Sequence, residues 1–395
     1  MRILMVTHSF PRVEGDVAGA SLWRLGEALA LRGHDVSVIA PADQGEVGEP
    51  MLGRVRVRRV RYASSAAETL AYQGTMHRQA ARSPLAALTF WKLVRAMSRA
   101  VSEEITGRGA QLVHAHWWVP GGLAVRRAER HGRQFIVTLH GTDVALAGRF
   151  PGGRSAMSGV LKQAATVTAV ASYLAAEAAE AMDVARTTFP ITPMPLGTGF
   201  MGDLDAARSG VVYVGSLARE KGVHILLEAL AMLRRDGMPL DLTIVGDGPE
   251  RANLKAQSRA LGLTTTFTGF IARELVAEHL HTKQAFVLPA LDQGVGLVVA
   301  EALAHGVPVV ASRSGGIPDL LADPEAGILV PPGDAVAVAS AIRSVIKEER
   351  YRVGAWRAGR ILVDQRSPEH IAEQFEALYT RSRTSRVSAD RTVAR

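Results

Sequence analysis

The sequence contains no cysteine among its 395 residues. That absence excludes a disulfide scaffold, a zinc site built on thiolates and a thiol nucleophile. The sequence also lacks a long apolar run, because the longest mostly apolar stretch, 294–311, is interrupted by two ionisable residues and a proline. We therefore expect no segment that spans a bilayer. Arg2 is the only charged residue before the apolar run 3–6, and that run is short, so we expect no secretory signal either.

Aromatic residues are scarce, at 5% of the chain, whereas positive charge is in excess. The 46 Lys and Arg residues outnumber the 38 Asp and Glu residues and give a net charge of +8. Such an excess favours anionic partners such as phosphates, acidic lipid surfaces or nucleic acid. The basic residues show no interleaved aromatic stacking platform, so we expect no nucleic-acid partner.

The first half of the chain alternates between strand and helix patterns. A buried strand at 2–7, an amphipathic helix at 20–32 and a strand at 35–40 form a βαβ unit, which implies a parallel sheet. The strand pattern recurs at 111–114 and 135–139. These residues predict one doubly wound α/β domain.

A second, independent series follows a stretch between 189 and 210 that is crowded with proline and glycine. Ligands of doubly wound sheets bind at the carboxyl ends of the strands, so we expect a site in the cleft where two such domains face each other. The predicted strands and helices of the second series are 211–215, 223–234, 240–245, a helix from about 249, 265–268, 285–288, a helix from 296, and 308–311. The predicted organisation is an N-terminal domain (1–195), a C-terminal domain (196–366), a C-terminal helix packing back toward the N-terminal domain (367–380) and a disordered basic tail (381–395).

Titratable residues follow the strand 135–139. A side chain at the carboxyl tip of a parallel strand, such as His140, points into the ligand crevice. The alternative is a loop histidine before a helix that Asp143 caps, and the residues alone leave both open. His114 and His116 lie two apart on a strand and lack a third ligand, so we expect no metal site.

Two cations stand where the next domain's first strand meets its helix. Arg219 and Lys221 run against the helix macrodipole at this end, and an anionic ligand such as a diphosphate would explain them. The alternative is a pair of solvated side chains paired with Glu220 or Glu228. We favour the ligand for Lys221 and solvent for Arg219.

A glycine-rich loop, 289–296, leads into an apolar helix that carries one acid, Glu301. A carboxylate buried there without a partner would be costly, so we expect it to bond a polar group such as ribose hydroxyls. The alternative is a solvent-facing position on a one-sided helix.

Seven motifs occur in order across both predicted domains, and together they resemble the family 4 glycosyltransferases, which are retaining, nucleotide-sugar-dependent enzymes of the GT-B type. The resemblance runs from residue 2 to roughly residue 380. The motifs are the loop with Gly19, His114-Ala115-His116-Trp117, His140-Gly141-Thr142-Asp143, 214–222, 245–251, Gln293 to Glu301, and 308–318.

The resemblance implies a role for each matching residue. Glu301 would hold the ribose, Lys221 the donor diphosphate, and His140 would lie beside the donor sugar. The Thr268-Gly269-Phe270 turn would border the base. The implied catalytic residues are His140, Lys221 and Gln293; the donor-binding residues are Gly19, Ser216, Arg219, Lys221, Gly269, Phe270, Gly294, Val295, Gly296, Leu297 and Glu301; His116 and Asp143 lie on the acceptor side.

Two positions depart from the family pattern. The first acid of the Glu-x7-Glu signature is replaced by Gln293, which still donates and accepts hydrogen bonds but carries no charge. The arginine of the usual Gly-Arg-Leu is replaced by Ser216, so Lys221 and Arg219 must supply the positive charge. The departure at Gln293 leaves three alternatives open, namely a different donor sugar, a shift of Asp292 into the role, or weak activity.

We therefore expect a cytoplasmic, bacterial enzyme of polysaccharide biosynthesis or a related pathway that transfers a hexose-type sugar from UDP- or GDP-sugar with retention, without a metal or other cofactor. The acceptor would be a polysaccharide, a lipid-linked sugar or a small molecule. One alternative is another GT-B enzyme, such as a nucleotide-sugar epimerase, which His140 and Lys221 argue against. Another is a catalytically impaired relative that binds a nucleotide sugar or a partner.

Basic residues also gather in the predicted N-terminal domain. The strand 54–62 alternates over its first half and presents an arginine-covered face. A helix that begins at Ser83-Pro84 has an apolar side and a basic side. Such a segment suits peripheral contact with an anionic membrane at the inner face of the cell membrane. The alternative is that the apolar stripe of this helix packs on the core of the domain while its basic face is solvated.

Overall fold

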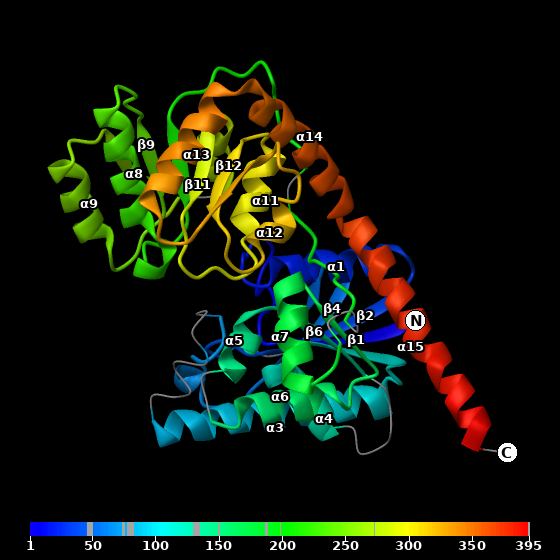
Figure 1. Ribbon diagram of the computed structural model, residues 1–395. Coiled ribbons are helices and arrows are strands. Elements are labelled where there is room, and N and C mark those ends of the chain that lie inside the picture. The colour runs from blue at the N-terminus through cyan, green and yellow to red at the C-terminus, as the bar shows by residue number, and fades with distance from the viewer. Residues whose placement is uncertain are drawn as a thin grey trace. The chain divides into compact units, whose positions relative to one another are not determined.

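The structure is a computed structural model, and it describes residues 1–45, 50–72, 76, 83–128, 135–148, 151–185, 189–197, 199–271 and 273–393. The chain divides into two compact units (Figure 1). Unit 1 comprises Met1–Gly197 and Arg366–Arg395, and unit 2 comprises Thr198–Gln365. The predicted boundaries at 195 and 366 lie within two residues of this division.

Unit 1 is built on a seven-stranded sheet in the order β3-β4-β2-β1-β5-β6-β7. Every described pairing is parallel except that of β3, which is an antiparallel edge strand on β4. In the centre, Val6 of β1 pairs with Ile39 of β2 and Ala115 of β5, and all three are fully buried. The strands are β1 (Arg2–Val6), β2 (Asp35–Pro41), β3 (Met51–Leu52), β4 (Val55–Val60), β5 (Leu112–His116), β6 (Phe135–Leu139) and β7 (Thr166–Ala169).

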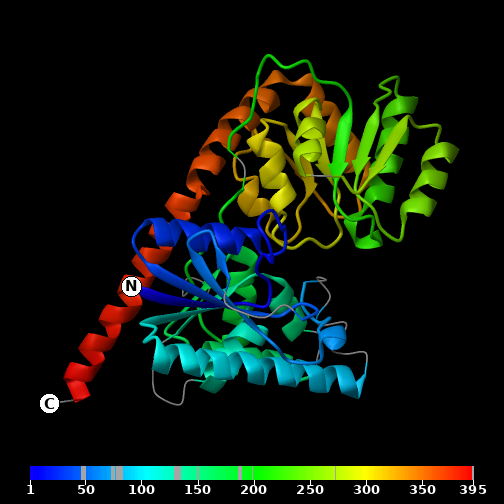
Figure 2. The ribbon, with the colours of Figure 1, turned by 180° about the vertical axis from the view of Figure 1, so that it is seen from behind.

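Helices cover both faces of this sheet, with α1 along one face and α3 along the other (Figure 2). The last helix, α15, packs beside α1. The helices of unit 1 are α1 (Ala20–Leu31), α3 (Pro84–Gly107), α4 (Leu123–Ala128), α5 (Thr142–Ala147), α6 (Gly153–Leu161), α7 (Ser172–Met182) and α15 (Pro368–Val393), with helical turns η1 (Ser65–Ala67) and η2 (Trp118–Gly122).

Unit 2 contains a second sheet, in the order β10-β9-β8-β11-β12-β13, and all pairings between its named strands are parallel. Helix α8 packs against α13, and α11 packs against α14. The predicted pair of doubly wound α/β domains is therefore confirmed. The elements are β8 (Val211–Val214), η4 (Arg219–Lys221), α8 (Val223–Arg235), β9 (Leu242–Val245), α9 (Arg251–Ala260), β10 (Thr265–Gly269), α10 (Arg273–His281), β11 (Ala285–Leu288), α11 (Leu297–Ala304), β12 (Val309–Ser312), α12 (Ile317–Leu320), β13 (Gly327–Val330), α13 (Ala335–Lys347) and α14 (Glu349–Gln365).

Two predictions about unit 1 differ from the structure. Helix α15 continues to Val393, whereas we expected the helix to end at residue 380 and the segment 381–395 to be disordered. Its extension is anchored at Ser382, whose hydroxyl is buried and hydrogen-bonded to the Thr166 hydroxyl at 2.7 Å. Residues 394 and 395 lie outside the described residues.

The arginine-covered face predicted for 54–62 is also incomplete. Arg56 and Arg58 on β4 are half-buried, but Arg59, one position out of phase, is only 5% exposed. The alternation ends there because the guanidinium of Arg59 bonds backbone carbonyls of the loop that follows β1.

Candidate functional site

The strand order of unit 2 marks where a ligand would bind on that unit. The first strand, β8, lies between β9 and β11, so the chain reverses its direction of travel across the sheet between β8 and β11. In open α/β sheets the ligand crevice lies outside the carboxyl ends of the strands at such a switch point. Here those ends carry the loops 215–222 and 289–296, the two loops that the sequence singles out.

Lys221 and Gln293 come together at this point. The Nζ atom of Lys221 donates a hydrogen bond to Oε1 of Gln293 at 2.9 Å and another to the carbonyl of Asp292 at 3.2 Å. Lys221 makes no ion pair with any other described residue, so its charge is held by neutral acceptors. The structure therefore joins two residues that were predicted from separate motifs.

Close backbone packing fixes the two loops against each other. Gly222 precedes α8 with φ of 71°, and a Cβ at this position would lie 1.9 Å from the carbonyl oxygen of Pro289. In addition, the backbone N–H of Leu291 donates to the carbonyl of Glu220 at 2.8 Å. Only glycine permits this approach, so the position of Lys221 depends on Gly222.

The other predicted donor-binding residues of the 289–297 loop lie next to Gln293. A third loop supports them, since Gln293 N–H donates to the Ser314 hydroxyl at 3.1 Å and Gly316 N–H donates to the Gly294 carbonyl at 2.9 Å. Val295 is half-buried, Gly296 caps α11 with φ of 74°, and Leu297 is 42% exposed.

Three further predicted donor residues differ in exposure. Glu301 lies half-buried within α11, whereas Ser216 and Arg219 are exposed. At the end of β10, the carbonyl of Gly269 accepts hydrogen bonds from Gly246 N–H at 3.0 Å and from the Thr268 hydroxyl at 2.9 Å.

The residue after this strand is unusually accessible. Phe270 is 82% exposed, more than any other large hydrophobic side chain of the described residues. Its ring is therefore open to a planar ligand.

Unit 1 has its own switch point between β1 and β5. The neighbouring carboxyl ends bring together His8, His116, Trp117 and His140 from three strands. The ring of His140 stacks on Trp117 with centroids 3.9 Å apart, and His8 contacts the same indole edge-on at 4.4 Å. The predicted catalytic histidine thus lies in an aromatic cluster.

A chain of hydrogen bonds lies behind His140. Its Nε2 atom is hydrogen-bonded to Nδ1 of His116 at 3.0 Å. His114 contacts the His116 ring and is itself hydrogen-bonded to the Thr138 hydroxyl at 2.7 Å and to the Tyr379 hydroxyl at 2.9 Å. Tyr379 belongs to α15, so the last helix of the chain supports this wall.

These histidines are neutral because of burial. Burial lowers the pKa of His114 to about 3 and holds the pKa values of His116 and His140 well below 6.5, with neighbouring histidines adding to the effect. The cluster therefore offers neutral imidazoles at neutral pH.

Asp143 holds the turn that presents His140. Its carboxylate accepts backbone N–H bonds from Trp118 at 3.0 Å, His140 at 3.2 Å and Gly141 at 2.9 Å. Burial raises the pKa of Asp143 to about 6, although these N–H bonds oppose the shift. Asp143 lies inside α5 and Gly141 precedes the helix, so placing Asp143 at the N-cap was wrong.

The two residues predicted on the acceptor side are buried in unit 1. His116 is 0% exposed and Asp143 is 2% exposed. Their side chains therefore support His140 and Trp118 from behind in this structure, and they do not form an accessible surface.

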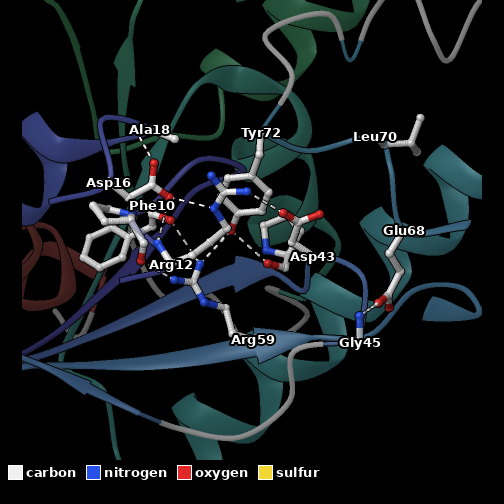
Figure 3. A network of polar contacts seen from close by, with 12 residues as sticks. Phe10, Arg12, Asp16, Ala18, Asp43, Gly45, Arg59, Glu68, Leu70 and Tyr72 are labelled. Atoms are coloured by element: carbon white, nitrogen blue, oxygen red, sulfur yellow. Dashed lines mark hydrogen bonds and ion pairs between the residues drawn. The ribbon is translucent and has the colours of Figure 1, made fainter. Parts of the chain in front are cut away.

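A polar network, buried at Arg59 and exposed at Arg12, anchors the loop between β1 and α1 (Figure 3). Arg59 donates to the carbonyls of Phe10 and Pro11 and, at 2.6 Å, to the hydroxyl of Tyr72. Farther along the loop, Arg12 bonds both Asp16 and Asp43 at 2.7 Å. The network fixes the path of the chain that leads to Gly19.

Gly19 itself is required by packing within the loop. Its φ is 73°, and a Cβ would lie 2.4 Å from the carbonyl oxygen of Ser9. Gly19 therefore brings this loop close to the start of α1, which is separate from the donor-binding role that the resemblance implies for this residue.

Known proteins are similar to this sequence over nearly its full length. A family model described as a glycosyl transferase 4-like domain matches residues 18–197, and a model described as glycosyl transferases group 1 matches residues 204–361. A glycogen synthase from Mycobacterium tuberculosis is 30% identical over 393 residues, which cover 91% of this chain and 89% of that protein. The chain belongs to the family 4 glycosyltransferases.

A further relative and two solved structures are also similar to this glycosyltransferase over nearly its full length. A GDP-mannose-dependent phosphatidylinositol monomannoside mannosyltransferase from Mycolicibacterium smegmatis is 29% identical, covering 91% of this chain and 92% of that protein. A sucrose-phosphate synthase from Thermosynechococcus elongatus has a TM-score of 0.73 at 23% identity, covering 97% of this chain and 99% of that one. Anabaena HepE in complex with UDP has a TM-score of 0.70 at 20% identity, covering 96% and 100%. The GT-B fold is thereby confirmed.

Sequence reasoning gave no individual role to three residues of unit 1 in this glycosyltransferase. His8 and Trp117 flank His140, and Arg59 holds the loop toward Gly19. Arg59 had a detectable signal, because it breaks the alternation of arginines along β4. His8 follows the first strand by two residues, and a histidine beyond a parallel strand end is the same signal that identified His140.

The part of this glycosyltransferase that the structure describes contains neither a metal-ligand cluster nor a membrane-spanning helix. Within the described ranges, no group of three or more histidine, aspartate or glutamate side chains is placed to hold a metal ion. Among the same residues, no helix has the length and hydrophobicity that a membrane crossing requires.

Proposed function

We propose that this family 4 glycosyltransferase transfers a hexose-type sugar from a UDP- or GDP-sugar to an acceptor hydroxyl with retention of configuration. The Lys221–Gln293 contact at the switch point of unit 2 carries the proposal. A cation held by neutral acceptors keeps its charge for an anionic ligand, and a diphosphate leaving group develops negative charge as the sugar departs. The reaction needs no metal or other cofactor.

Solved and curated relatives support a nucleotide-sugar donor. Anabaena HepE, which shares the fold, has been solved with UDP and with UDP-glucose. The Mycolicibacterium relative is GDP-mannose-dependent. In our proposal Glu301 bonds the ribose, Phe270 and Gly269 border the base, and Lys221 with Arg219 binds the diphosphate.

The proposed chemistry is a same-face displacement. The bond between the sugar C1 and the diphosphate oxygen breaks, and a bond from the acceptor oxygen to C1 forms on the same face. The acceptor proton passes to the departing diphosphate oxygen. Lys221 stabilises that oxygen, and His140 positions the sugar, so catalysis rests on positioning and electrostatics.

The acceptor in this proposal is a polysaccharide, a lipid-linked sugar or a small molecule, and the reaction takes place in the cytoplasm. Peripheral contact with an anionic membrane through α3 is part of the proposal. Lys92, Arg95 and Arg99 on this helix are exposed and make no ion pair with another described residue. Exposed cations of this kind attract anionic headgroups.

Donor turnover and product configuration test the proposal. The protein is incubated with UDP-glucose, UDP-galactose and GDP-mannose, nucleotide release is measured, and the anomer of the product is read by proton NMR. We expect release from one donor with retained configuration, and loss of turnover in Lys221→Ala but not in Arg235→Ala, an exposed cation at the far end of α8. An inverted product would contradict the proposed mechanism.

A substitution at Gln293 tests the alternative that the protein is a catalytically impaired relative. A glutamate at 293 would place a carboxylate where the amide now accepts from Lys221. If the wild type binds nucleotide without turning over any donor and Gln293→Glu gains turnover, the impaired alternative replaces the proposed activity.

A further inference from the structure

Unit 1 contains a cavity of about 490 Å³ beside the aromatic cluster. Phe90 and Trp91 of α3, Trp118 of η2 and Leu146 of α5 line it, together with His8 beyond β1. Sites for small molecules commonly have volumes of about 300–1,000 Å³. The cavity is therefore large enough for a substantial part of a ligand.

Most polar groups in the lining already have partners within the protein. The indole N–H of Trp117 donates to the Thr142 hydroxyl at 3.1 Å, and that of Trp118 donates to the Asp143 carbonyl at 2.7 Å. The Asp143 carboxylate accepts three backbone N–H bonds. What the lining offers a ligand is mainly ring faces and methyl groups. A sugar buried there would leave hydroxyls unpaired, which is costly.

His8 is the remaining ionisable side chain of the described lining. Nδ1 of His8 is buried and has no hydrogen-bond partner among the described residues. His8 contacts Trp117, on which His140 stacks. His8 therefore brings an imidazole to the part of the lining that adjoins Trp117 and the proposed catalytic histidine.

The α3 side of the cavity carries exposed apolar side chains. Trp91 is 51% exposed although it lines the cavity, and Leu88, one turn earlier on α3, is also 51% exposed. Apolar side chains so exposed favour an apolar occupant that reaches the cavity from this side.

We propose that this cavity binds the hydrocarbon chain of an amphiphilic acceptor, with the hydroxyl-bearing end of the acceptor at His8 and His140. The inference rests on the proposed function and narrows its acceptor to an amphiphile. It assigns Phe90, Trp91 and Trp118 to the hydrocarbon and His8 to the polar end.

A chain-length series tests the inference. The full-length protein is titrated by calorimetry with n-alkyl β-glucosides from methyl to octyl, each below its critical micelle concentration. Each methylene buried should tighten binding about fourfold, and the heat capacity change should become more negative along the series. Affinity that is independent of chain length would overturn the proposal.

Two variants separate the cavity from the exposed helix surface. Ala87→Trp places a bulky ring in the lining from a half-buried position on α3, and it should weaken octyl glucoside at least tenfold while methyl glucoside is unaffected. Leu85→Ala is the matched control, because Leu85 is 71% exposed on the same helix and does not line the cavity. The proposal is wrong if Leu85→Ala weakens the octyl compound and Ala87→Trp does not.

UDP and GDP are titrated into the same samples so that the two proposals fail separately. Nucleotide binding without chain-length dependence overturns the apolar site and leaves the transferase proposal standing. Chain-length dependence without nucleotide binding supports the apolar site and contradicts the transferase proposal.

Discussion

Replacing Gly222 by alanine tests whether two strand-end loops hold the proposed diphosphate site. Gly222 adopts φ of 71°, and a Cβ there would lie 1.9 Å from the Pro289 carbonyl oxygen. Gly237, at the opposite end of α8, is the matched control. Its φ is 78°, but no heavy atom lies within 4 Å of a Cβ at that position.

The two substitutions share one energetic cost and differ in another. An alanine in the left-handed region costs about 1–2 kcal/mol at either position. Gly222→Ala must also move the 289–296 loop, and overpacking of this kind adds about 1–3 kcal/mol. At about 2–4 °C per kcal/mol for a unit of this size, Gly237→Ala should lower the Tm by about 2–8 °C. By the same conversion, Gly222→Ala should lower it by about 2–12 °C more.

Thermal unfolding and nucleotide titration of both variants provide the assay. We expect Gly222→Ala to lose affinity for UDP or GDP because Lys221 moves with the loop, whereas Gly237→Ala retains it. Equal losses of Tm and equal nucleotide affinity in the two variants would refute the packing argument.

Three further predictions concern unit 1. Burial lowers the folded-state pKa of His114 to about 3. The free energy of unfolding of the wild type therefore falls by about 1.4 kcal/mol per pH unit, for each such histidine, as the pH drops below 6.5. His114→Gln removes one such histidine and should reduce this pH dependence. Asp143, whose pKa is raised to about 6, opposes this loss, and urea unfolding between pH 7 and 4.5 measures the net slope. Tyr72→Phe removes an acceptor of the buried Arg59 guanidinium and should lower the free energy of unfolding by about 1–3 kcal/mol, as chemical denaturation would show. His140→Ala should lower kcat about 100-fold or more and leave the nucleotide Kd unchanged, measured by donor turnover and calorimetry.

Most strands could be predicted because local sequence signals mark where they begin and end. Strand β11, Ala285–Leu288, matches its prediction residue for residue, since a short apolar run ends at Pro289. Helix α15 was predicted too short because its extension depends on a contact between Ser382 and Thr166, 216 positions apart. Local composition carries no information about such a contact.

The sequence was sufficient to predict which loops form the candidate site. Parallel strands bring their carboxyl ends to one edge, which is why Lys221 and Gln293 could be expected near each other. Their hydrogen bond depends on the approach of Gly222 to Pro289, which the sequence does not reveal. Likewise, His140 could be predicted from its strand end, but its supporting partners could not.

The most direct measurement is the binding of UDP and GDP to the wild type and to Lys221→Ala, Glu301→Ala and Arg235→Ala by thermal shift. A nucleotide at 100 times its Kd should stabilise the wild type by about 2.7 kcal/mol. The account predicts this stabilisation for one of the two nucleotides, its loss in Lys221→Ala and Glu301→Ala, and its retention in Arg235→Ala. Stabilisation that survives in Lys221→Ala, or no stabilisation of the wild type by either nucleotide, would contradict the proposed donor site.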